Sequence, residues 1–237
     1  MDEEELFGML EDKNSNLDKM AEENKSSGNS TRPNLWEKTD FKLVRVDVEK
    51  LKKTGKSFGI FLSGRDSDVP AEAKEKIIKV ARALILKGYS YRTSGGSQDT
   101  INAEIVAIEN SNSEYYLPWK SYNKNVVKPV LRYPTELGYQ YAFSNHKAFP
   151  KLPATVRAIL ASNVHVLLGK DCTDPLDLII VYSPKGDEVI NKDTDYKQAG
   201  NTVFPIKIAS SCNIPVFNIQ KEDTVTRLVD YIKSQEK

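Results

Sequence analysis

The chain has few residues of the two kinds that build most metal and redox sites. Its 237 residues include two cysteines, Cys172 and Cys212, and two histidines, His146 and His165. The cysteines fit no metal-binding or redox spacing, and so few histidines leave little room for a metal site or a His-based triad. We therefore expect no metal ion, and two reduced thiols in a cytosol-like compartment.

The sequence also lacks a long apolar run and a basic leader. No apolar run approaches the ~18 residues that a membrane span needs. The first ten residues, MDEEELFGML, are acidic where a secretory signal is basic. Apolar residues make up 39% and charged residues 28% of the chain, which excludes collagen-like and wholly disordered classes. We expect a cytoplasmic protein that binds no membrane.

Two nucleotide-binding fingerprints are missing. The sequence contains neither the GxGxxG pattern of dinucleotide-binding folds nor the GxxxxGK[ST] pattern of P-loop proteins. The sequence therefore gives little support for an ordinary NAD-dependent dehydrogenase or an ATPase.

An acidic arm precedes a mildly basic body. Residues 1–31 contain nine acidic residues and three lysines, which gives about −6 and leaves about +7 on residues 32–237. Residues 24–34 have linker composition, so we expect a largely disordered arm and linker over 1–34 and a folded domain over 35–237. The arm is read as a solubilising tail, as a shield over an anion site of the body, or as a segment that docks on a protein partner. Its apolar contacts would be Leu6, Phe7, Met9 and Leu10.

From residue 57 onward, short apolar runs alternate with helical patterns. Strands are expected over 58–62, 89–93, 115–119, 177–182 and 214–219, and helices over 71–87, from about 98, from 154, over 201–211 and over 222–235. Pro70 and Gly88 mark the start and the end of the first helix. Residues 120–150 are expected to form an irregular insertion or lid. The alternation predicts an α/β fold, a Rossmann-like and mainly parallel sheet of about five to seven strands with helices on both faces.

Three turns rich in glycine and small polar residues stand between a strand and a helix. They are Ser63-Gly64-Arg65-Asp66, Ser94-Gly95-Gly96-Ser97 and Ala199-Gly200-Asn201-Thr202. In an open parallel sheet such turns lie at the carboxyl edge, where ligands bind. Glycine lets a ligand approach the backbone, and each helix N-terminus offers free N–H groups to a phosphate. The three turns together predict a phosphate-binding edge.

Four charged residues accompany these turns. Arg65 and Arg92 flank two of them, where a guanidinium can clamp a phosphate. Asp99 and Glu104 follow the second turn and can accept ribose hydroxyl groups, and Glu104 can also act as a base. Each of the four is equally compatible with an ordinary helix or surface role.

The run GIFLSGRDSDVPAEAKEKIIKVARALILKGYSYRTSGGSQDTINAE resembles the SMF/DprA–LOG (SLOG) Rossmann-like superfamily. The family's GSR and SGGAxGaD patterns match Ser63-Gly64-Arg65 and Ser94-Gly95-Gly96-Ser97, with Asp99 and Glu104 following. Downstream, the strand before Ser183, the turn Gly200-Asn201-Thr202 and the strand IPVFNI are similar to the distal half of phage and bacterial DprA-like proteins. The resemblance spans about residues 57–220.

The resemblance implies one of three activities. We expect non-catalytic binding of a nucleotide or a nucleotide-derived signal, with phosphate contacts from Gly95, Gly96, Ser97 and Thr202, in a phage protein that acts on host signalling or DNA metabolism. DprA-like binding of single-stranded DNA, with stacking on the tyrosine-rich segment 115–143, is one alternative. LOG-like hydrolysis of nucleoside monophosphates is another, although its PGGxGTxxE motif reads AGNTVFP here and lacks the glutamate. We also expect a homo-oligomer and no cofactor other than the nucleotide.

Overall fold

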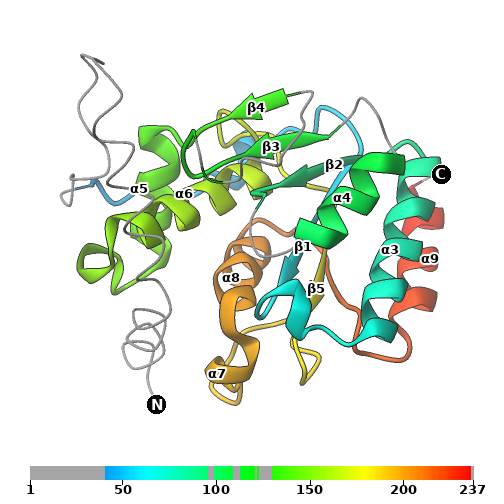
Figure 1. The fold of residues 1–237 in the computed structure, drawn as a ribbon. Coiled ribbons are helices and arrows are strands. Elements are labelled where there is room, and N and C mark those ends of the chain that lie inside the picture. Colours follow the sequence, from blue (N-terminus) through cyan, green and yellow to red (C-terminus); the bar gives the residue numbers. More distant parts are fainter. Residues whose placement is uncertain (1–40, 96–98, 109–112, 121, 123–129, 236–237) are drawn as a thin grey trace.

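The computed structural model describes residues 41–95, 99–108, 113–120, 122 and 130–235. The acidic arm, with Leu6, Phe7, Met9 and Leu10, lies outside these residues. Six parallel strands form one sheet in the order β4-β3-β2-β1-β5-β6 (Figure 1). The strands are β1 (Ser57–Leu62), β2 (Ser90–Thr93), β3 (Glu114–Tyr116), β4 (Val130–Arg132), β5 (Leu178–Tyr182) and β6 (Val216–Asn218). The α/β prediction is therefore confirmed.

Helices cover both faces of this sheet. They are α3 (Ala71–Leu86), α4 (Asp99–Ile108), α5 (Glu136–Asn145), α6 (Ala154–Leu168), α7 (Tyr196–Ala199), α8 (Val203–Ser211) and α9 (Thr224–Gln235). Short 3-10 helices are η1 (Val48–Lys50), η2 (Asp66–Asp68), η3 (Phe149–Lys151) and η4 (Gly200–Thr202). As the sequence predicts, α3 begins directly after Pro70 and is followed by Gly88 at φ +81°.

Two apolar clusters, one on each face, hold the layers together. Phe58, Ile60 and Leu62 of β1 pack with residues of α3, α4 and α9, whereas Phe61 packs with residues of α5, α6 and α8. Figure 1 shows these two groups of helices on opposite faces of the sheet. Side chains alternate along β5 in the same way, because successive residues of a strand point to opposite faces. A strand covered on both faces must be apolar throughout, and all five residues of β5 are buried.

Residues 130–132 and 136–145 form β4 and α5, so the expectation of an irregular insertion or lid over 120–150 does not hold there. Helix α5 packs on α6, and both Tyr139 and Ala142 are buried. Gly138 permits this approach, because a Cβ there would lie 2.4 Å from Nε2 of His165. The helix is held by tertiary packing, since its sequence ELGYQYAFSN has weak helix propensity.

The chain changes direction across the sheet once. It runs outward from β1 through β2 and β3 to β4, and then returns to place β5 on the other side of β1. The carboxyl ends of β1 and β5 therefore flank the switch point, where open α/β sheets bind ligands. Among the helices that the structure describes, none is both long and apolar enough to cross a membrane.

Candidate functional site

The switch point is built by a very close approach between two loops. Ser63 follows β1, and its carbonyl oxygen accepts a hydrogen bond of 3.2 Å from the backbone N–H of Asn201. Gly200 has φ +50°, and a Cβ on it would lie 2.2 Å from the Ser63 oxygen. Glycine at position 200 is thus required by packing against β1. This contact brings η4 and the N-terminus of α8 to the end of β1.

The loop after β1 places an exposed cation, Arg65, close to this contact. The backbone N–H of Arg65 donates to Oδ2 of Asp68 at 3.1 Å, and the N–H of Asp68 donates back to the Arg65 carbonyl at 3.0 Å. The side chain of Arg65 is exposed, while Ser63 and Gly64 are half-buried. η2, which begins at Asp66, lies against α4. The loops after β1 and β2 are therefore neighbours.

A buried hydrogen-bond chain fixes the turn after β2. The N–H of Gly95, which has φ +66°, donates to Oγ1 of Thr93 at 3.1 Å. Thr93 Oγ1 in turn donates to Oδ1 of Asn102 at 3.2 Å, and the Tyr91 hydroxyl donates to the same oxygen at 2.5 Å. Asn102 is 5% exposed, and within the described part of the chain its Nδ2 donates to no atom.

Asn102 is a site residue that the sequence analysis missed. The sequence motifs point only to the turn and to the charged residues Asp99 and Glu104. An asparagine three residues into a helix gives no signal in a single sequence, because the same residue type is common on solvated helix surfaces. Only the convergence of Tyr91 and Thr93 on its oxygen reveals that it supports the turn.

Two of the predicted ligand-binding residues, Ser183 and Thr202, are buried, and their hydroxyl groups form hydrogen bonds within the protein. Ser183 is fully buried, and its hydroxyl donates to Asp187 Oδ2 and accepts from the Asp187 N–H and from Asn218 Nδ2, at 2.9–3.1 Å. A hydroxyl has one proton and two lone pairs, so nothing remains for a ligand. Thr202 is also fully buried, and its Oγ1 donates to the Ala199 carbonyl at 2.6 Å.

Some of the predicted ligand-binding residues lie together at the carboxyl edge of the sheet, and the others do not. Ser63, Gly64, Arg65, Ser94, Gly95, Gly200 and Asn201 lie in the carboxyl-edge loops. Asp99 opens α4, and Glu104 is exposed on the same helix. Gly96 and Ser97 lie outside the described residues.

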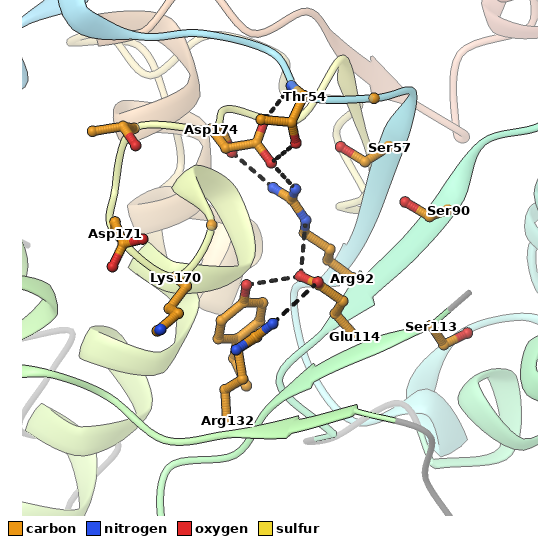
Figure 2. A pocket seen from close by; sticks show the side chains of 14 residues that line it. Thr54, Ser57, Ser90, Arg92, Ser113, Glu114, Arg132, Lys170, Asp171 and Asp174 are labelled. Atoms are coloured by element: carbon orange, nitrogen blue, oxygen red, sulfur yellow. Dashed lines mark hydrogen bonds and ion pairs between the residues drawn. The ribbon is translucent and has the colours of Figure 1, made fainter. Parts of the chain in front are cut away.

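Arg92 does not join the carboxyl-edge group, because its side chain is bound in a cavity at the opposite, amino edge of the sheet. Its guanidinium is 6% exposed, donates to the carbonyl of Asp174 at 2.7 Å, and also contacts the Asp174 carboxylate (Figure 2). Its Nε lies 3.4 Å from Oε2 of Glu114, which accepts from the Tyr116 hydroxyl at 2.8 Å. The predicted phosphate clamp by Arg92 at the turn after β2 therefore has no geometric basis.

No protein family model, curated protein or solved structure shows significant similarity to the chain. The resemblance to the SLOG superfamily accordingly stays a prediction from its motifs.

Proposed function

We propose that the protein binds a nucleotide or a nucleotide-derived signal, without catalysis, at the carboxyl edge around the end of β1, beside the switch point between β1 and β5. The observation that carries the proposal is the switch point itself. There η4 lies against the loop Ser63–Arg65 that follows β1, and the turn Ser94–Gly95 after β2 lies on the other side of β1. In open α/β sheets this crevice is the usual place for a nucleotide.

The chemistry of the loops favours an oxyanion. Arg65 carries an exposed guanidinium, which can form two parallel hydrogen bonds to a phosphate. The N-terminus of α4 follows the turn after β2 and supplies a partial positive charge. Asn102 supports this turn from the interior, because its amide oxygen accepts from the hydroxyl groups of Tyr91 and Thr93. Ser183 and Thr202 have no part in the proposal.

No specific observation favours the DNA-binding alternative. Its proposed stacking residues in the segment 115–143 are largely interior, since Tyr115, Tyr116, Tyr139 and Tyr141 are 1–9% exposed. Buried rings cannot form a stacking platform for bases. Hydrolysis is not proposed because the AGNTVFP segment has no acid in place of the missing glutamate.

The test is calorimetric titration of the full chain with AMP, ADP and ADP-ribose, comparing wild type with Arg65→Gln. We expect saturable binding of at least one of these and an affinity loss of about tenfold in the variant, as for one charge-assisted contact. Arg82→Gln is the matched control, because Arg82 is exposed on α3 away from the loops. No binding by wild type, or equal losses in both variants, would overturn the proposal.

The non-catalytic part needs its own measurement. AMP is incubated with the protein, and free adenine is sought by chromatography. We expect none above the rate without protein. Release of adenine that scales with protein concentration would replace the binding function with the phosphoribohydrolase alternative.

A further inference from the structure

We propose that the cavity at the amino edge of the sheet is a second binding site, which takes a small organic anion with one phosphate or carboxylate group. The cavity has a volume of about 520 Å³, within the size range of small-molecule sites. It is lined by the starts of β1, β2 and β3, by Arg132 of β4 and by the loop between α6 and β5 (Figure 2). The site does not depend on the carboxyl-edge proposal.

A partly buried ion-pair network ties the segments of the cavity wall together. Asp174 accepts from the backbone N–H and the hydroxyl of Thr54 at 2.8 and 2.7 Å, in addition to binding Arg92. Gly169 is needed beside it, because it has φ +72° and a Cβ would lie 3.1 Å from Cβ of Asp174. Asp177 ties the start of β1 to the same loop by accepting from the Ser57 N–H at 2.8 Å. The cavity is therefore formed before any ligand arrives.

In the same network, the two innermost carboxylates, Asp174 and Glu114, form ion pairs with Arg92. Asp174 and Glu114 face Arg92, and Glu114 also accepts from Tyr116 and lies 3.8 Å from Arg132. Figure 2 shows these groups joined in one chain across the middle of the cavity. Arg92 and, more loosely, Arg132 balance these two negative charges, so the carboxylates repel an anion less than unpaired carboxylates would.

Several donors around the network remain unused. The hydroxyl groups of Ser57 and Ser113, on residues 2% and 0% exposed, have no hydrogen-bond partner in the described residues. The same holds for Nε of Arg132, whose weak 3.8 Å contact to Glu114 leaves most of its guanidinium free. A buried donor without a partner is costly, so these atoms mark this part of the cavity wall as incompletely satisfied.

Lys170 adds a cation at the rim. It is exposed, and no ion pair is found for it with any described residue. In Figure 2 its side chain lies on the same side of the Arg92–Glu114 pair as Arg132. The acceptor left over is Asp171, also exposed at the rim. Arg132 and Lys170 thus place two cations beside one exposed carboxylate, Asp171, on this side of the cavity. This local arrangement favours the anionic group of a ligand, and Asp171 can accept from a hydroxyl group of the same ligand.

The experiment titrates the full chain at low salt with ribose 5-phosphate, gluconate and ribose. We expect one or both anions to bind and neutral ribose not to bind, and the stronger of the two anions identifies phosphate or carboxylate as the preferred group. Arg132→Gln and Lys170→Gln should each weaken anion binding about tenfold, whereas Lys233→Gln, an exposed lysine on α9, should leave it unchanged. Thermal melts confirm that each variant is folded. Lys170 is exposed, so its variant tests the site even if Arg132→Gln fails to fold.

Two results would overturn the inference. One is the absence of anion binding, which would mean that the cavity holds water only. The other is binding that neither Arg132→Gln nor Lys170→Gln weakens. Arg65→Gln should not change the affinity for ribose 5-phosphate, so failure at this edge is distinguishable from failure at the carboxyl edge.

Discussion

Arg92 and Asp174 join two distant segments of the chain at the amino edge of the sheet. The guanidinium of Arg92 contacts both the main-chain carbonyl and the carboxylate of Asp174. Through these contacts, β2 is tied to the loop that precedes β5, 82 positions further along. Because β1 lies between β2 and β5, the pair acts as a brace across the centre of the sheet.

Loss of the contact between Arg92 and Asp174 should strongly destabilise the protein. Arg92→Met keeps the length of the side chain but leaves Asp174 without its cation. We expect a loss of about 2–4 kcal/mol in the free energy of unfolding, somewhat less than for a fully buried ion pair from which one partner is removed, because the Asp174 side chain is 18% exposed. Urea denaturation measures it. Arg82→Met on the exposed face of α3 is the control and should change stability little. Similar decreases in the free energy of unfolding of the two variants would mean that the contact between Arg92 and Asp174 does not stabilise the fold.

Gly200→Ala should destabilise the fold through the contact with Ser63. The Cβ would meet the Ser63 carbonyl oxygen at 2.2 Å, and the backbone has φ +50°. We expect a loss of about 2–4 kcal/mol, since overpacking and the left-handed conformation each contribute. In contrast, Gly55→Ala meets nothing within 4 Å and should be nearly neutral. Equal unfolding midpoints for both variants would contradict the close approach.

The Glu188–Arg227 pair predicts a pH-dependent contribution to stability. Burial by itself raises the pKa of Glu188, but hydrogen bonds from Arg227, Lys221 and the Asn218 N–H outweigh burial and lower the pKa. A carboxyl whose folded pKa is lowered stabilises the protein above its unfolded pKa of about 4.3, and this contribution is lost as the pH falls through the folded pKa.

Arg227→Gln should therefore cost more at neutral pH than in acid. We expect about 1–2 kcal/mol at pH 7, a value reduced because the Arg227 side chain is 36% exposed, and a clearly smaller cost below about pH 4. Urea denaturation at both pH values measures the difference. An equal cost at both would show that the pair does not couple to protonation of Glu188.

The two cysteines should resist alkylation in the native protein. Cys172 and Cys212 are free thiols that are 2% and 5% exposed. Burial raises the pKa of Cys172 to about 12 and raises that of Cys212 as well, and the reactive species is the thiolate. Iodoacetamide at pH 8 should leave both unmodified by mass spectrometry, and both should react in urea. Rapid modification without denaturant would contradict this burial.

Local sequence patterns were sufficient to predict the strands that alternate regularly with helices. The five runs expected as strands are found as β1, β2, β3, β5 and β6. β1 and β5 are buried along their whole length because both of their faces are covered, whereas β2 and β3 also carry the charged residues Arg92 and Glu114. Residues 130–145 could not be read in this way. β4 is three residues long, and α5 depends on the close contact of Gly138 with His165 rather than on its own propensity.

For the candidate site, too, the sequence predicted one part and the tertiary structure decided the other. The sequence by itself determined that Ser63–Asp66, Ser94–Gly95 and Gly200–Thr202 follow strands of a parallel sheet, and hence that they meet at its carboxyl edge. Only the tertiary structure decided what each side chain does there. Ser183 is saturated by Asp187 and Asn218, and Arg92 turns to Asp174 at the other edge. These outcomes depend on partners as many as 82 residues away, and no local pattern carries that information.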